Sequence, residues 1–191
     1  MVTDVHILDT TLLSYYKYSL KKITYGYSNN DKPMVNTREV YDRGNGAVIL
    51  LYNPVSKTVI LTRQFRLPSF LNGNTDGMLV EACAGLLDRE DPETCIRRET
   101  EEETGYRLTG IRKVYEAYMS PGSVTEILHF FIAEYNASMK MAEGGGLEEE
   151  HEHIEVLEIA FDEAMRMTTN GGIKDAKTIL LLQHLKLNAL I

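Results

Sequence analysis

Apolar and polar positions along the chain follow different patterns before and after residue 45. Residues 16–27 are rich in tyrosine and partly alternate with polar positions, which is typical of a half-buried strand. Residues 29–33 have the composition of a turn, and residues 34–42 can return as a second strand. The first ~45 residues therefore predict an antiparallel β-meander.

The remainder of the chain mixes short apolar runs with longer periodic segments. Residues 47–52 are a continuous apolar run whose length fits a buried strand, and residues 68–77 are predicted to form a polar loop. Further strands are predicted at residues 58–64 and 78–84 and near 111–118, 125–135 and 154–159. Helices are predicted at residues 92–104, 161–169 and 175–189. Because strands and helices do not alternate strictly, this order predicts an α+β fold with layers around a mixed sheet.

The predicted helix at residues 92–104 has clear end signals and an unusual acidic face. Asp91 is its expected N-cap, Pro92 stands at its first position, and Gly105 follows its end. These three residues fix which side chains share a face of the helix.

Three glutamates, Glu99, Glu102 and Glu103, fall within about 100° of one another around this helix. Carboxylates three and four positions apart repel each other, and a hard cation such as Mg²⁺ or Mn²⁺ removes that repulsion by binding their oxygens. The alternative is a solvated helix face on which Arg97 and Arg98 form salt bridges. The helix alone leaves both interpretations open.

The net charge of −8 restricts the choice of partners. An acidic surface repels nucleic acid, but a bound cation still lets it accept a small anionic substrate. The two cysteines, Cys83 and Cys95, form no CxxC pair and are expected to be buried thiols. No apolar run approaches the ~18 residues of a membrane span, and residues 1–10 lack the pattern of a signal peptide, so no membrane partner and a cytoplasmic location are expected.

The sequence around the acidic helix resembles the signature of the Nudix family of metal-dependent diphosphate hydrolases. That signature combines a glycine, a glutamate, an Arg-Glu pair, a Glu-Glu pair and a closing glycine at set spacings. The matching positions are Gly85, Glu90, Arg98, Glu99, Glu102, Glu103, Gly105 and Tyr106. Two departures occur: the first glycine and glutamate are separated by four residues instead of five, and Thr100 replaces the hydrophobe after Arg-Glu. Neither departure touches a metal-ligand position.

The resemblance implies a divalent metal site, with Mg²⁺ as the expected ion and Mn²⁺ as a substitute. Its implied ligands are one backbone carbonyl and three carboxylates: Ala84, Glu99, Glu102 and Glu103. The residues implied to shape this signature segment, the Nudix box, are Gly85, Glu90, Arg98 and Gly105. Among these, Glu90 would orient the ligands, and Arg98 would pair with a carboxylate to hold the helix in place.

A segment rich in glycine and glutamate, residues 144–155, is the candidate for the rest of the site. Its composition leaves open a disordered, solvated loop. Nudix enzymes that act on ADP-ribose and on sugar nucleotides have a similar Glu-x-Glu-x-Ile-Glu segment, whose glutamates supply the catalytic base or a metal ligand. The resemblance therefore implies catalytic roles for Glu150 and Glu152, with Glu152 preferred as the base and as a further metal ligand. Residues 144–146 are expected to act as a hinge.

Substrate contacts are expected from lone cations and from positions that match the sugar-nucleotide branch of the family. Arg66 follows a predicted strand, a usual place for a phosphate contact, although a surface salt bridge is the alternative for any lone arginine. The positions implied to contact substrate are Arg38, Glu39, Arg66, Ala84, Gly85, Leu86, Glu103, Glu126, His151, Glu152 and Lys177.

The expected fold is α+β, a Nudix α/β/α sandwich with an N-terminal antiparallel β-sheet. Residues 1–45 are expected to form a dimerisation segment and residues 46–191 the Nudix hydrolase domain. The resemblance implies hydrolysis of a nucleoside diphosphate sugar, with GDP-mannose as the first substrate and ADP-ribose as the alternative. It also implies a homodimer that exchanges its N-terminal sheets. A nucleotide sensor without catalysis is disfavoured, because the glutamate set is intact. A purely structural dimer module is the other alternative, and thermal stabilisation of the protein by a divalent metal would argue against it.

Overall fold

The computed structural model describes residues 1–147, 149 and 153–191. The chain divides into two compact units. Unit 1 comprises Met1–Asn45 and Tyr118–Ile127, and unit 2 comprises Gly46–Ala117 and Leu128–Ile191. The predicted division at residue 45 stays a prediction, because the loop at residues 118–127 also belongs to unit 1.

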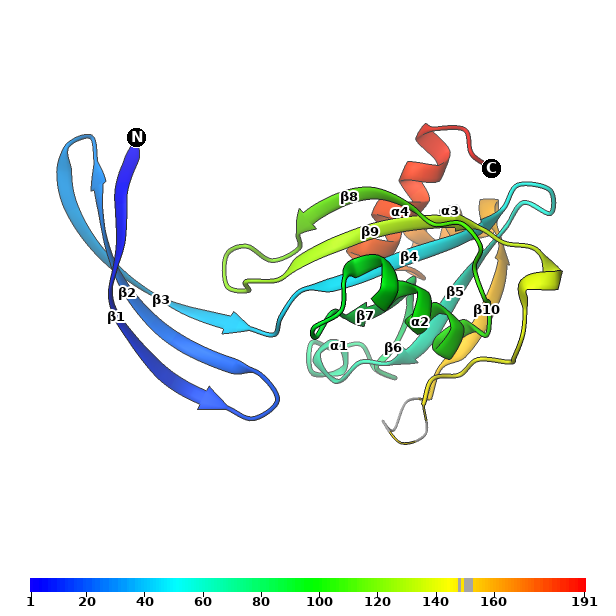
Figure 1. The fold of residues 1–191 in the computed structure, drawn as a ribbon, viewed down its shortest axis with the longest axis horizontal. Helices are drawn as coiled ribbons and strands as arrows, with labels where there is room; N and C mark the ends of the chain where they lie inside the picture. Colours follow the sequence, from blue (N-terminus) through cyan, green and yellow to red (C-terminus); the bar gives the residue numbers. More distant parts are fainter. Residues whose placement is uncertain (148, 150–152) are drawn as a thin grey trace. The chain divides into compact units, whose positions relative to one another are not determined.

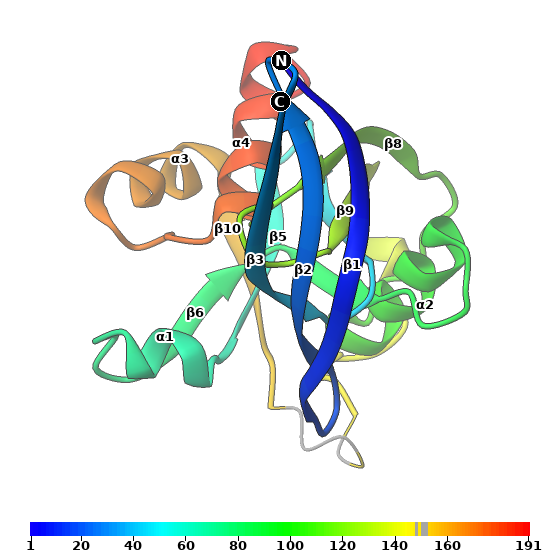
Figure 2. The same ribbon diagram turned by 90° about the vertical axis from the view of Figure 1, so that its left-hand side faces the viewer.

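Unit 1 is built on a three-stranded antiparallel sheet (Figures 1 and 2). Its strands are β1 (Val2–Tyr15), β2 (Ser19–Asn29) and β3 (Lys32–Asp42), in that order. Asn30 and Asp31 connect β2 to β3 with φ of 49° and 62°, the left-handed pair that a two-residue hairpin turn requires. The predicted meander is confirmed: the strands expected at residues 16–27 and 34–42 are β2 and β3, and β1 is an additional strand that was not predicted.

Unit 2 contains a seven-stranded mixed sheet with the order β10-β5-β4-β9-β8, in which β6 also pairs with β5 and β7 with β4. The strands are β4 (Gly46–Asn53), β5 (Thr58–Phe65), β6 (Met78–Glu81), β7 (Cys83–Leu86), β8 (Arg112–Tyr118), β9 (Ile127–Glu134) and β10 (Glu155–Ala160). Strand β4 runs antiparallel to β5 and parallel to β9. The mixed sheet is therefore confirmed.

Helices lie on both faces of this sheet. Figure 2 shows α2 (Pro92–Thr104) on one side and α3 (Phe161–Asn170) and α4 (Ala176–Leu187) on the other. Ile49 and Leu51 of β4 pack in one buried cluster with Ile96 of α2. The alternating residues Val48 and Leu50 are equally buried and face the opposite side, because successive strand side chains point to opposite faces. The predicted three-layer arrangement is confirmed.

Two local expectations are corrected. Residues predicted as a polar loop include a short helix, α1 (Leu67–Leu71), with Pro68 in its first turn, where a missing N–H costs nothing. The single strand predicted at residues 78–84 is two strands, because β6 pairs with β5 and β7 pairs with β4. At the change of partner, the Ala82 N–H donates to Thr178 Oγ1 at 2.7 Å instead of to a neighbouring strand. A short 3-10 helix, η1 (Ala137–Met139), follows β9.

In the part of the chain that the structure describes, no helix combines the length and the apolar character needed to cross a membrane.

Candidate functional site

Helix α2 is fixed at both ends by its cap residues. The Asp91 carboxylate accepts from the backbone N–H groups of Glu93 and Thr94, each at 3.1 Å. Gly105 ends the helix with φ of 76°, and a Cβ there would lie 2.0 Å from the Ala142 carbonyl oxygen. Only glycine fits that backbone conformation and that close approach. The caps therefore set the rotation at which α2 presents its acidic face.

Arg98 organises three carboxylates on this face. It donates to Glu90 and Glu99 through Nη2 at 3.1 and 3.0 Å and to Glu102 through Nη1 at 2.7 Å. Burial alone would lower the pKa of Arg98, but the charges of Glu99, Glu102 and Glu90 and the hydrogen bond to Glu90 outweigh it and raise that pKa. Arg97 instead pairs with Glu93 at 2.7 Å. Arg98 is therefore the central cation of this face.

Glu99 and Glu103 face strand β7. An ideal Cβ on Gly85 would lie 2.3 Å from the Glu99 carboxylate, so only a glycine lets Glu99 rest against the backbone there. Glu103 is 3% exposed. The pKa of Cys83 is raised first by burial and then by the negative charge of Glu103, and its thiol donates to Thr100 Oγ1 at 3.9 Å. The two carboxylates therefore flank the short backbone segment on either side of Ala84.

The donor chemistry of this place fits a hard divalent cation. Glu99 and Glu103 offer carboxylate oxygens, and the intervening strand residue Ala84 offers a carbonyl oxygen, which are the ligand types that Mg²⁺ prefers. Among the described residues, no three His, Cys, Asp or Glu side chains are already gathered as a complete metal site. Glu102 in particular is paired with Arg98. For Glu102 to join Glu99 and Glu103 as a metal ligand, its carboxylate would have to exchange its ion pair with Arg98 for the cation.

Strand β7 also carries two predicted substrate contacts, Gly85 and Leu86. Both are half-buried and offer backbone rather than side-chain polar groups to a ligand. The Leu86 carbonyl accepts from the Cys95 thiol at 3.2 Å. Burial raises the pKa of Cys95 to about 12. Both predicted thiols are thus buried, and Cys95 helps to hold β7 against α2.

The glycine run at residues 144–146 is docked on the C-terminal end of α2. The N–H of Gly145 donates to the Glu103 carbonyl at 2.9 Å, and that of Gly146 to the Glu102 carbonyl at 3.2 Å. The N–H of Ile154 then donates to the Gly145 carbonyl at 3.1 Å, so the segment between them starts and ends at the helix. The predicted residues Glu150, His151 and Glu152 lie outside the described residues.

Two predicted substrate cations, Arg66 and Lys177, meet at a buried glutamate. Arg66 Nε donates to one oxygen of Glu81 at 2.6 Å, and Lys177 Nζ donates to the other at 2.5 Å. Sequence analysis missed Glu81. The available signal was a single charge inside the apolar stretch at residues 78–84, because a buried charge requires partners.

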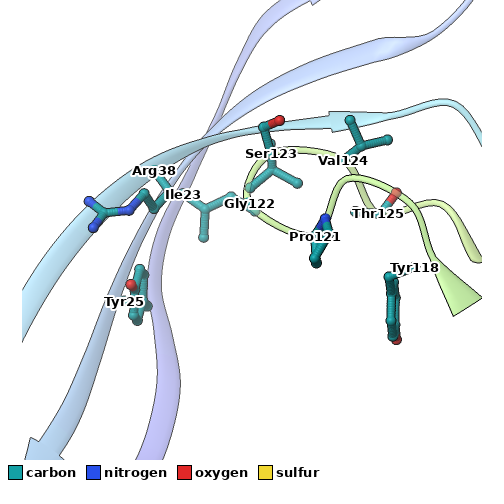
Figure 3. A pocket seen from close by; sticks show the side chains of 10 residues that line it. Ile23, Tyr25, Arg38, Tyr118, Pro121, Gly122, Ser123, Val124 and Thr125 are labelled. Atoms are coloured by element: carbon teal, nitrogen blue, oxygen red, sulfur yellow. The ribbon is translucent and has the colours of Figure 1, made fainter. Parts of the chain in front are cut away.

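The remaining predicted contacts lie in unit 1. Arg38 lines a cavity of about 500 Å³ together with Ile23, Tyr25 and Val40 of the sheet, Tyr118, and residues 121–125. Figure 3 shows Tyr25 and Arg38 on the strands of the sheet, Pro121 on the facing loop, and Tyr118, the last residue of β8. Two backbone hydrogen bonds attach the loop to β3. The Tyr41 N–H donates to the Ser123 carbonyl at 2.8 Å, and the Thr125 N–H donates to the Tyr41 carbonyl at 3.1 Å.

Arg38 and two acidic residues of unit 1 differ in how they are held. Arg38 donates to Asn36 Oδ1 at 2.7 Å and to the Thr37 carbonyl at 2.9 Å. Glu39, its neighbour on β3, is exposed. Glu126 is half-buried and pairs with Arg43 at 3.6 Å. The predicted substrate residues thus form two groups, one in each unit.

Comparison with known proteins places this box and its surrounding chain in a family. A model of the NUDIX domain matches residues 42–182. This chain belongs to the NUDIX family. The match includes the whole central sheet and α2, so the Nudix signature predicted from the sequence is confirmed as part of a full Nudix domain.

The NUDIX relatives also match outside that domain. The GDP-mannose pyrophosphatase of Cronobacter sakazakii is 53% identical to this chain over 192 residues and 100% of both chains. The protein of the same name from Salmonella arizonae is 52% identical, and that from Klebsiella pneumoniae is 48% identical, with 96% of its own length covered. The similarity therefore includes the N-terminal sheet as well as the Nudix domain.

Proposed function

We propose that this Nudix hydrolase cleaves the diphosphate bond of GDP-mannose and releases GMP and mannose 1-phosphate. The observation that carries the proposal is the pair of carboxylates, Glu99 and Glu103, held against the glycine of the Nudix box. The substrate class is supported by relatives about half identical over the full chain, whose name is GDP-mannose pyrophosphatase. A box alone would support diphosphate hydrolysis without selecting the substrate.

The proposed metal is Mg²⁺, with Mn²⁺ as a substitute. Its proposed ligands are the carboxylates of Glu99, Glu102 and Glu103, the carbonyl of Ala84, and the carboxylate of Glu152. When bound, a divalent cation neutralises the diphosphate and makes a coordinated water more acidic. For Glu102 to bind it, the ion pair with Arg98 must rearrange. Glu90 keeps Arg98 in place through its own hydrogen bonds during that change.

The proposed base is Glu152, with Glu150 as the second choice. In the reaction, the oxygen of a water forms a bond to one phosphorus, the bond between that same phosphorus and the bridging oxygen breaks, and the bridging oxygen leaves with the other phosphoryl group. A carboxylate must take a proton from that water. Gly145 and Gly146, which precede both glutamates in the sequence, donate to the carbonyls of Glu103 and Glu102 at the C-terminal end of α2, and Ile154, which follows them, donates to Gly145. That attachment supports a catalytic role for this loop.

The proposed substrate contacts combine cations with backbone groups. Arg66 and Lys177 are suited to bind phosphate oxygens, and the backbone of Gly85 and Leu86 is suited to the approach of a polar ligand. From unit 1, the proposed contacts are Arg38, Glu39 and Glu126, and His151 of the loop is proposed to join them. Guanine presents two adjacent donors, N1–H and the 2-amino group, for which carboxylate oxygens such as those of Glu39 or Glu126 are acceptors.

A homodimer with exchanged N-terminal sheets is the proposed assembly. Strand β1 is an edge strand, all 14 of its residues are exposed, and they include Ile7, Leu8 and Leu12. An exposed edge rich in apolar side chains needs a surface to cover it. A second copy of the chain would provide that surface, and Arg38 and Glu39 would then contribute to the partner's nucleotide site.

Product analysis tests the proposed reaction. The protein is incubated with GDP-mannose and Mg²⁺, and the products are separated by anion-exchange chromatography. Equal amounts of GMP and mannose 1-phosphate are expected, together with complete inhibition when the metal is chelated. Release of GDP and free mannose would instead show cleavage of the glycosidic bond and would contradict the proposal.

A further inference from the structure

Glu81 is a buried carboxylate that joins two elements far apart in the sequence. It is the last residue of β6, and its side chain is 4% exposed. Arg66 comes from the end of β5, and Lys177 from the first turn of α4. A carboxylate at such depth needs charged or polar partners, so the ion pairs of Glu81 are part of the packed structure of unit 2.

Each oxygen of Glu81 binds a different cation. Oε2 accepts from Arg66 Nε at 2.6 Å, and Oε1 accepts from Lys177 Nζ at 2.5 Å. Lys177 is mostly buried, with a side chain 15% exposed, and it also donates to Asp175 at 2.8 Å. Arg66 is 41% exposed. One cation is therefore fixed on two carboxylates, and the other is held at one point and open to solvent.

Arg66 is held through its Nε atom, and this decides which nitrogens of its guanidinium can bind a phosphate. Glu81 takes the Nε–H, and within the described part of the chain it is the only acid paired with Arg66. The two terminal nitrogens of a guanidinium form the fork that binds phosphate oxygens in pairs. Holding Nε therefore orients that fork without using it.

The same cluster is tied to the strand that leads into the Nudix box. Thr178 Oγ1 accepts from the Ala82 N–H at 2.7 Å and donates to Asp175 at 2.6 Å. Ala82 stands directly between Glu81 and β7, the strand that carries Ala84 and, against Glu99 of the acidic helix, Gly85. The first turn of α4 is thus fixed against the residues that precede the candidate metal ligand.

We propose that Glu81 is a positioning residue for substrate binding, which holds Arg66 and Lys177 together as one cationic pair for a phosphate group of the diphosphate. The proposal rests on the proposed function, in which both cations contact substrate. Glu81 itself would touch neither the substrate nor the metal. It would act through Arg66 and Lys177, which contact the substrate.

Removing the carboxylate has two opposite effects on phosphate binding. The nearby negative charge disappears, which by itself would strengthen the attraction of an anion. The two cations also lose their common anchor and repel each other, and the half-exposed Arg66 becomes free to rotate into water. We expect the loss of orientation to dominate, because a paired hydrogen bond between a guanidinium and a phosphate requires fixed geometry.

The test is Glu81→Gln, with Arg66→Gln and the double variant in a mutant cycle. Glu81→Gln is expected to raise KM for GDP-mannose about tenfold with a smaller change in kcat, the signature of lost substrate binding. In the Arg66→Gln background, the same substitution should change KM much less, since Glu81 acts through Arg66. The matched control is Glu101→Gln, which breaks an exposed ion pair with Arg107 and should leave KM unchanged.

Glu81→Asp keeps the buried charge but shortens the side chain, so it is the second variant if Glu81→Gln fails to fold. It should raise KM for the same reason, and inhibition by added inorganic pyrophosphate should weaken in parallel. An unchanged or lower KM in the folded variants, or equal effects with and without Arg66, would overturn the positioning role. Failure of the wild-type protein to hydrolyse GDP-mannose would instead overturn the proposed function.

Discussion

Strands β1 and β4 have very different surroundings although both are rich in apolar residues. Seven of the eight residues of β4 are buried, and α2 and α4 cover its two faces. In β1, all 14 residues are exposed, and seven of them are Val, Ile, Leu or Tyr with 44–74% of their surface open. Burial of apolar surface stabilises a fold by about 25 cal/mol per Å². The Nudix unit gains that energy within the chain, whereas β1 does not.

This difference indicates what each unit contributes to the proposed function. Unit 2 has a core of its own and carries the carboxylates of α2 and the Arg66–Glu81–Lys177 cluster. Unit 1 carries Arg38 and its cavity on a sheet whose edge strand has no apolar cover in the described chain. We therefore expect the metal site and the phosphate contacts to depend on unit 2 side chains, and assembly and the nucleotide contacts to depend on unit 1.

The largest expected effect comes from removing residues 1–45. The truncated protein should be monomeric by analytical ultracentrifugation and should show only background hydrolysis of GDP-mannose, because the partner's Arg38 and Glu39 are lost from each site. Circular dichroism would confirm that the Nudix unit is still folded. A folded monomer that still hydrolyses GDP-mannose well would contradict the shared site.

Glu103→Gln tests the metal site within unit 2. Turnover should fall by at least ~10³, equivalent to about 4 kcal/mol of transition-state stabilisation, because the substitution removes the charge of a metal ligand. The matched control is Glu101→Gln on the opposite side of the same helix, where the carboxylate pairs with Arg107. It should leave turnover unchanged. Near-normal Mg²⁺-dependent activity in a folded Glu103→Gln protein would exclude Glu103 as a required ligand.

Glu152→Gln is expected to have a smaller effect that separates catalysis from binding. As the proposed base, Glu152 should contribute about 10²–10³ to kcat with little change in KM. Steady-state kinetics over a range of GDP-mannose concentrations measures both constants. If KM rises while kcat stays constant, Glu152 binds substrate, and the base is another residue. Glu150→Gln, measured in parallel, is the comparison within the loop.

Local chemistry accounts for the parts of the fold that sequence reasoning predicted well. The bounds of α2 follow from a side-chain cap, a proline and a glycine, each of which acts within one helical turn. The division of residues 78–86 into β6 and β7 was missed, because it depends on pairing with different strands and on a bond to Thr178, 96 residues away. Helix α1 was missed because a five-residue helix has almost no periodicity to detect.

The candidate site shows the same limit. Helical periodicity alone brings Glu99, Glu102 and Glu103 to one face, and the structure has them there. The Glu81 cluster could not be predicted, since Arg66 follows β5, Glu81 ends β6 and Lys177 begins α4, and the three meet only after the sheet forms. The roles of Glu150, His151 and Glu152, the preference for Mg²⁺ and the cytoplasmic location stay predictions.

The measurement that tests the central claim most directly is kcat/KM for GDP-mannose against ADP-ribose, with Mg²⁺ and the full-length protein. A site built to accept hydrogen bonds from guanine should reject adenine, because acceptors that lose their water when the base binds would be left without partners. We predict that GDP-mannose has the higher kcat/KM. Faster turnover of ADP-ribose than of GDP-mannose and other GDP-sugars would contradict the proposed substrate and leave the Nudix diphosphatase chemistry in place.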